Sequence, residues 1–161
     1  MNLSGVNKKT IEEKFLKNEV AGLLSKLQKD SIPDWGNMTA QQMVEHLIWT
    51  FDVSFGKIRV ECFTPKNKLT VFKKFLFSDH PTKQNFRNPL LVDGLPELQH
   101  ESLGAAIATL KSTIQRFYSI YNTENSKEEI HPIFGTLNFE EWERAHYKHC
   151  FHHLQQFDLF R

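Results

Sequence analysis

The stretch that decides the fold is NFEEWERAHYKHCFHHLQQF, residues 138–157. Asn138, with Glu141 three positions later, forms a capping box, in which the two side chains accept backbone N–H groups at a helix start. Successive residues of a helix are rotated by about 100°, so Trp142, His149, His153 and Phe160 fall close to one line along it. The stretch therefore predicts a helix that ends near the C-terminus and carries two histidines in the middle of its apolar face.

Three earlier segments also have apolar residues at alternating spacings of three and four, which is the period of an amphipathic helix. They run from about Lys9 to Leu27, from Thr39 to near Gly56, and from about Glu97 to Tyr121. The second begins with a capping box of its own, Thr39 with Gln42. We therefore expect an all-α fold, a four-helix bundle in a single domain over residues 1–161.

A long, poorly patterned segment, residues 57–96, separates the second and third predicted helices and holds four of the six prolines. Within it, Leu69 to Phe77 is amphipathic and predicts a short helix. Lys57 to Phe63 is the one weak strand candidate in the chain. A connection of this length predicts a crossover or a functional lid.

The composition excludes several classes of protein. The chain has 161 residues, 40% hydrophobic and 24% charged, which is a globular balance. Its net charge of +1 gives no reason to expect a nucleic-acid partner. No apolar run reaches the length of a membrane span, so we expect no membrane partner. The N-terminus has no secretory signal, and Cys62 and Cys150 form no disulfide framework, so a cytoplasmic location is expected.

The histidines of the last helix suggest a metal site. His149 and His153 are separated by four positions, so their rings can point to one locus on the same side of the helix. A third ligand must come from another helix, and His46 is the best candidate because it shares a face with Met43 and Trp49. The alternative is that these are core histidines satisfied by hydrogen bonds in a metal-free bundle.

The motifs around these histidines resemble those of a known family. TAQQMVEHL, residues 39–47, resembles the second-helix signature of the DinB-like (YfiT-like) superfamily. HCFHHLQQ, residues 149–156, resembles the H-x-x-x-H-x-x-Q signature of the last helix in that superfamily. HPIFG, residues 131–135, resembles the sequence of an uncharacterised branch of the same superfamily. The match extends from about Trp35 to Leu159.

The resemblance implies a four-helix bundle that binds a divalent metal, zinc, nickel or iron, through three histidines. Carried over by position, these are His46, His149 and His153. Gln156 matches the trailing residue of the motif and is a candidate hydrogen-bond partner of a ligand. Characterised relatives transfer or isomerise substrates with low-molecular-weight thiols, many others are described only as metal-dependent hydrolases, and homodimers are frequent. The long middle segment differs from that of the better-known transferases, so their substrates cannot be carried over.

We therefore expect a metal-dependent enzyme in which the ion activates a thiol or water for transfer or hydrolysis on a small molecule. His131 and His146 are candidates for a hydrogen-bond partner of a ligand or a proton shuttle; their plainer interpretations are a turn cap and a residue flanking the core. No general base is identified, and a non-catalytic metal- or ligand-binding bundle remains the alternative. A run of basic residues either attracts an anion to the site or forms a solvated face. It comprises Lys57, Arg59, Lys66, Lys68, Lys73 and Lys74.

Overall fold

Helices dominate the computed structural model, which describes residues 11–85 and 94–161. A helical turn over residues 11–14 continues through the π-helix η1 (Phe15–Glu19) into α2 (Val20–Leu24). The later helical elements are α3 (Ala40–Ser54), η2 (Lys66–Lys68), α4 (Leu69–Leu76), α5 (Leu103–Thr123) and α6 (Phe139–Gln156). The mostly helical class is as predicted, and so is the short helix α4. The predicted start of the first helix, Lys9, lies outside the described residues.

Both predicted capping boxes are confirmed. The Thr39 hydroxyl accepts a hydrogen bond from the Gln42 N–H at 3.1 Å, and the Gln42 side chain accepts one from the Thr39 N–H at 2.9 Å. At the start of α6, the Asn138 side chain accepts from the Glu141 N–H at 2.9 Å, and the Glu141 carboxylate accepts from the Asn138 N–H at 3.1 Å. Each box satisfies N–H groups that a helix start leaves without intrahelical partners.

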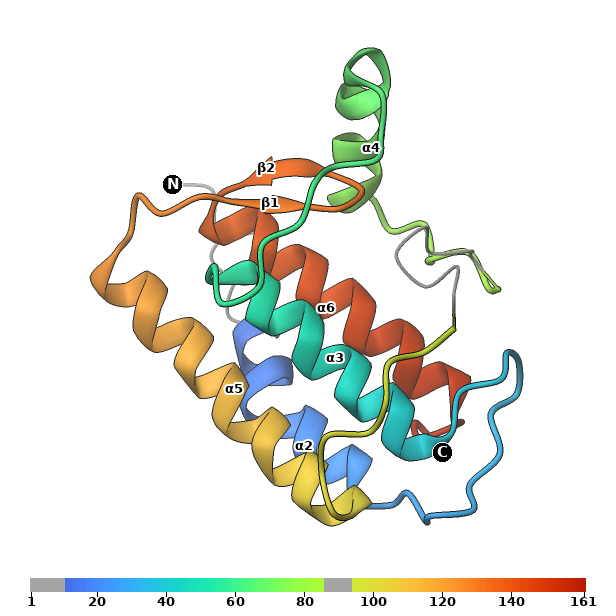
Figure 1. Cartoon of the computed structure of the whole chain (residues 1–161). Helices are drawn as coiled ribbons and strands as arrows, with labels where there is room; N and C mark the ends of the chain where they lie inside the picture. Colours follow the sequence, from blue (N-terminus) through green and yellow to red (C-terminus); the bar gives the residue numbers. More distant parts are fainter. Residues whose placement is uncertain (1–10, 86–93) are drawn as a thin grey trace.

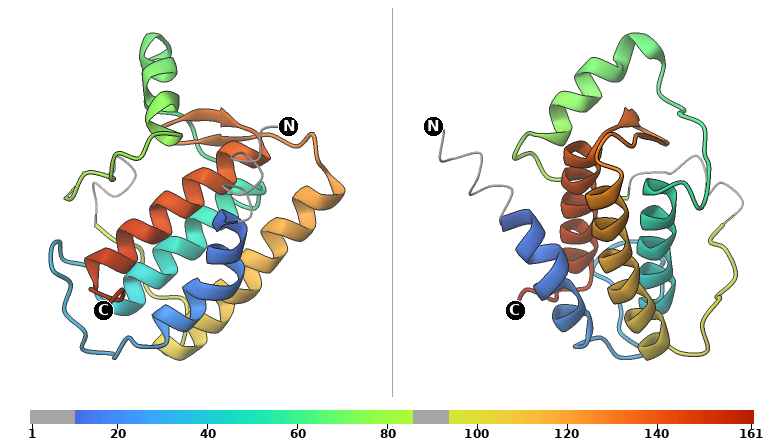
Figure 2. Two further views of the ribbon diagram at one scale, coloured as in Figure 1. Left: turned by 180° about the vertical axis from the view of Figure 1, so that it is seen from behind. Right: turned by 90° about the vertical axis from the view of Figure 1, so that its left-hand side faces the viewer.

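The long helices lie side by side around one apolar core, and α4 projects beyond the hairpin at one end of the molecule (Figures 1 and 2). Side chains from the N-terminal helix, α3, α5 and α6 meet in this core. Its largest fully buried members include Leu16, Leu24, Met43, Leu47, Phe51, Leu110, Ile114, Phe117, Trp142 and Leu154. Among the described residues, none of the helices combines the length and the apolarity needed to cross a membrane.

The third long helix begins later than predicted. Its N-cap is Ser102, whose hydroxyl accepts a hydrogen bond from the Ala105 N–H at 3.1 Å. The preceding residues are held instead by α3, because the Gln99 N–H donates to the Glu45 carboxylate. A start at about Glu97 is therefore wrong, since hydrogen bonds to α3 keep Gln99 and His100 out of the helix.

The strand prediction is also wrong. Residues 57–63 form no strand; the N–H groups of Lys57 and Ile58 fold back onto the Asp52 carbonyl at 3.0 and 3.2 Å. The strands that do form are β1 (Glu129–His131) and β2 (Gly135–Leu137), an antiparallel hairpin that the sequence patterns did not reveal. Strands of this length are too short to display an alternating pattern.

Candidate metal centre

Three histidines from two helices converge where α3 faces α6. The Nε2 atoms of His46 and His149 are 3.0 Å apart, and those of His149 and His153 are 3.1 Å apart. One ligand atom from each of the three residues lies within 4.8 Å of the others. Imidazole nitrogens that bind one zinc ion at its usual bond length are about 3.4 Å apart in a tetrahedral site. The structure thus brings together the three residues that the sequence selected, at spacings close to those of a ligand set.

Gln156 determines which nitrogen of His153 faces this cluster. The Gln156 amide NH₂ donates to the Trp35 carbonyl at 3.0 Å, so its Oε1 is the atom placed 2.7 Å from His153 Nδ1. An amide oxygen only accepts hydrogen bonds, so Nδ1 must carry the ring proton. His153 Nε2 therefore presents a lone pair to the other two rings, which is the form that ligates a metal.

The segment before α3 holds this amide in place, a role that the sequence patterns did not predict. The Asp34 N–H donates to the Gln156 carbonyl at 2.7 Å. Gly36 has a φ of +78°, and a Cβ there would lie 3.0 Å from the Gln156 side-chain nitrogen. The turn-forming composition of residues 30–36 marks a loop, but only the fold shows that the loop contacts the end of α6.

Burial keeps the three imidazoles neutral near pH 7. It lowers the pKa of His46 to about 4, with a smaller contribution from His152. Burial first, and then the neighbouring histidines, place the pKa values of His149 and His153 well below the ordinary value; for His153 the Gln156 hydrogen bond opposes this. Neutral imidazole is the metal-binding form, so the site is ready to bind a cation without first losing protons.

Hydrogen bonds between the three rings cannot give every ring nitrogen of the cluster a partner. His149 Nε2 lies near two ring nitrogens at once, and a single proton on it points along only one of those directions. His153 Nε2 has no proton to offer because its proton is on Nδ1. A divalent cation between the three nitrogens would engage every lone pair that faces the cluster, so the donor set fits such an ion.

The chain matches the model of a protein family. A family model described as "Protein of unknown function (DUF1569)" matches residues 14–159. The chain belongs to the DUF1569 family. The match spans α3 and α6, and with them the three histidines of the cluster in this DUF1569 chain. No curated protein and no solved structure matches it.

Polar and aromatic groups of the DUF1569 chain flank the cluster. The ring of His152 lies 5.5 Å from that of Trp35 and 5.1 Å from that of His153. Glu45, next to His46 in sequence, turns away from the cluster and accepts a hydrogen bond from the Gln41 side chain at 3.0 Å. Among the described residues, the cluster itself contains histidines alone, with no carboxylate.

The other two histidine candidates of the DUF1569 chain lie outside the cluster. His131 Nδ1 accepts the N–H groups of Ile133 and Phe134 at 3.0 and 3.2 Å, so it caps the turn between β1 and β2. Burial lowers its pKa to about 3. His146 is stacked on Phe51, with ring centroids 3.7 Å apart, and its two buried ring nitrogens have no hydrogen-bond partner among the described residues. Neither contributes a nitrogen to the three-histidine group.

Cys150, which follows His149 in α6, is part of the core. Its side chain is fully buried, and burial raises its thiol pKa to about 12. A buried thiol with a raised pKa is a poor nucleophile. The residue therefore acts as a small hydrophobe.

Proposed function

We propose that this protein is a metal-dependent enzyme of the DinB-like four-helix-bundle type. His46, His149 and His153 hold a divalent ion, with zinc or nickel preferred and iron as the other candidate. The observation that carries the proposal is the fixed tautomer of His153: the Gln156 amide holds the proton on Nδ1, which leaves the Nε2 lone pair facing the two other rings. A buried imidazole held in this way is typical of a metal ligand.

The proposed reaction is transfer or hydrolysis on a small electrophile, with a low-molecular-weight thiol or water as the nucleophile. When bound, the ion supplies a positive charge that lowers the pKa of a coordinated water or thiol toward neutrality. Three neutral imidazoles add no negative charge, so little of that charge is offset. Gln156 keeps His153 oriented, and the rings of His46 and His149 are partly buried.

The first experiment measures metal content by elemental mass spectrometry on tag-free protein. We expect near-stoichiometric divalent metal in the wild type and a loss to background in His149→Ala. His152→Ala is the matched control, because it removes a neighbouring imidazole of the same helix that lies outside the three-histidine group. Wild-type protein that binds neither zinc nor nickel at micromolar concentration would overturn the proposal.

The alternative is a non-catalytic metal-binding bundle. It is favoured by the lack of a general base: among the described residues no carboxylate belongs to the cluster, and Glu45 is engaged by α3 and by the Gln99 N–H. Catalysis requires a coordination position open to thiol or water. Loading with Co²⁺ and adding a small thiol discriminates between the two: a new charge-transfer absorption supports the enzyme, and an unchanged spectrum supports the closed, structural site.

A homodimer and a cytoplasmic location remain predictions. Aromatic rings of the N-terminal helix and of α6 meet at the surface, where Ile11, Phe151 and Phe160 are exposed, and this patch supports a second copy as partner. Light scattering over a concentration series tests the dimer. The two cysteines, Cys62 and Cys150, are free, which agrees with a reducing compartment.

A further inference from the structure

The segment that carries α4 combines cationic and exposed apolar side chains. We call residues 62–78 the α4 arm; they include four lysines and neither aspartate nor glutamate. Figure 1 shows α4 beyond the hairpin, at the end of the molecule where β1 and β2 lie. Three large apolar side chains of the arm face solvent: Phe63 is 48% exposed, Val71 68% and Phe77 46%. The three-histidine cluster lies elsewhere, between α3 and α6.

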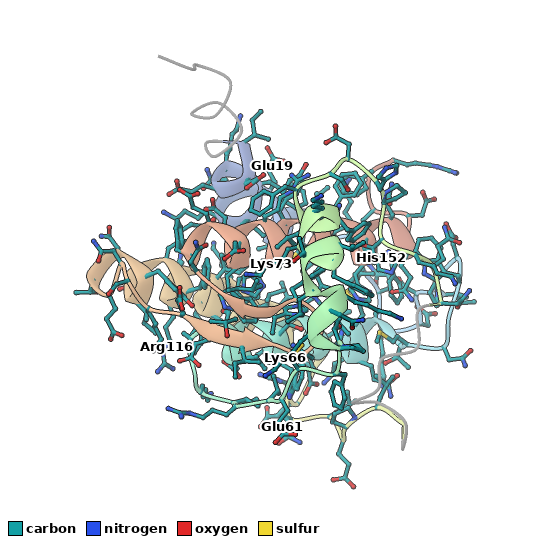
Figure 3. The ribbon with its side chains drawn as sticks, turned by 90° about the horizontal axis from the view of Figure 1, so that it is seen from above. Glu19, Glu61, Lys66, Lys73, Arg116 and His152 are labelled. Atoms are coloured by element: carbon teal, nitrogen blue, oxygen red, sulfur yellow. The ribbon has the colours of Figure 1, made fainter. Side chains whose placement is uncertain are left out.

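Three of the four lysines have no carboxylate partner among the described residues. Lys73 is the exception: it pairs with Glu141 at 3.1 Å and donates to the Thr136 carbonyl at 2.9 Å. Lys66, Lys68 and Lys74 are exposed and form no ion pair with any described residue. Figure 3, which looks down on this end, labels Lys66 and Lys73 along α4. The acids nearest in sequence, Glu61 and Asp79, lie just outside the arm.

The arm is fixed to the body at its C-terminal end. Leu76 is buried, and Arg144 donates through Nε to the Leu76 carbonyl and through Nη2 to the Ser78 carbonyl, both at 2.9 Å. Lys148 donates to the carbonyls of Phe75, Ser78 and His80. Two cations of α6 thus satisfy the carbonyl groups at the end of α4. The apolar and cationic side chains beyond this attachment are therefore held in a fixed, outward position.

One side of α4 forms an open groove of about 480 Å³. It is lined by Thr70, Lys73, Lys74, Phe77 and Ser78. Exposed aromatic and aliphatic side chains surrounded by lysines are typical of protein segments that lie at the boundary of lipid headgroups and acyl chains. A membrane surface accepts a projecting patch without a matching shape, whereas a protein partner needs a complementary concave surface. These features favour a membrane over an acidic protein.

We propose that the α4 arm binds the surface of membranes that contain anionic lipids. Phe63, Val71 and Phe77 enter the headgroup region, while the three unpaired lysines lie near the lipid phosphates. The expectation of no membrane partner rested on the absence of a spanning segment, and a surface contact requires none. The proposal is independent of the metal centre, so His149→Ala is expected to bind vesicles like the wild type.

Vesicle co-sedimentation tests the proposal with the full chain. One set of vesicles contains phosphatidylcholine alone, and the other contains an equal part of phosphatidylglycerol. We expect binding to the anionic vesicles only, weakened by added salt. Each lysine near an anionic surface contributes about fivefold in affinity, so the triple variant K66E/K68E/K74E should bind at least about a hundredfold more weakly.

The matched control is K26E/K29E/K111E, which changes the net charge equally with exposed lysines outside the arm. It should retain most of the binding. The double variant V71S/F77S tests the apolar contribution: both side chains are exposed, so the fold is expected to survive while vesicle binding falls. Equal losses in the arm and control variants would overturn the proposal, and so would binding to neutral vesicles or no binding at all. Binding to polyglutamate but not to vesicles would overturn it in favour of an acidic protein partner.

Discussion

Replacing Gln156 with leucine tests the proposed metal centre most directly. The change removes the acceptor 2.7 Å from His153 Nδ1 and the donor 3.0 Å from the Trp35 carbonyl, at a position that is 4% exposed. A buried donor left without a partner costs about 1–3 kcal/mol. The imidazole can avoid part of that cost by moving its proton to Nε2, where it blocks the lone pair that faces His46 and His149.

The expected result is a loss of metal affinity of about 10- to 100-fold, the usual effect of removing the hydrogen-bond partner of a ligating histidine. That loss corresponds to about 1.4–2.8 kcal/mol of binding free energy. Gln156→Glu keeps an acceptor for His153 Nδ1 but loses the donor to the Trp35 carbonyl. It should therefore retain metal affinity while the metal-free protein loses stability.

The assay is competition with a chromophoric chelator for Zn²⁺ and Ni²⁺, with urea unfolding of each variant as the measure of stability. Nitrogen NMR of the histidine rings reports where the His153 proton resides. Gln155→Leu is the matched control, because Gln155 is exposed on the same helix. Wild-type affinity in Gln156→Leu, or an equal loss in Gln155→Leu, would refute the assignment of the tautomer as the cause.

Three further predictions concern stability. Burial lowers the pKa of His46 to about 4 and that of His131 to about 3, so each takes up a proton on unfolding below its ordinary pKa of 6.5. Metal-free protein should therefore lose stability as the pH falls from about 6.5 toward 4, by about 1.4 kcal/mol per pH unit for each such histidine, measured by urea unfolding; a flat profile contradicts this. His146→Phe removes two buried nitrogens that have no hydrogen-bond partner among the described residues, from a ring stacked on Phe51, and should raise the unfolding free energy by about 1 kcal/mol; a decrease shows that the imidazole has a partner in solution. Gly36→Ala should lower the free energy of unfolding by about 1–2 kcal/mol, because alanine is strained at a φ of +78°. It should also weaken metal binding, and unchanged metal affinity would show that Gly36 does not support the site.

The helices follow from local signals. The capping boxes at Thr39 and Asn138 and the apolar period after them lie within a few residues of the elements they specify, so the sequence located both helix starts. The late start of α5 could not be found in the same way, because it depends on hydrogen bonds between residues 97–100 and α3. The missed hairpin has strands too short for a pattern, and its turn is organised by His131.

The candidate metal centre likewise has features set by the local sequence and features set by tertiary contacts. That His149 and His153 lie on one face of one helix follows from the amino-acid order alone, since a separation of four positions makes it a property of helix geometry. The sequence also selected His46, because an imidazole on an apolar face needs a partner. That these three nitrogens meet, that Gln156 fixes the proton of His153, and that the Trp35 carbonyl fixes Gln156 were decided by the tertiary structure alone. The physical reason is that a hydrogen bond depends on distances of tenths of an ångström, and only packing sets such distances between segments far apart in the chain.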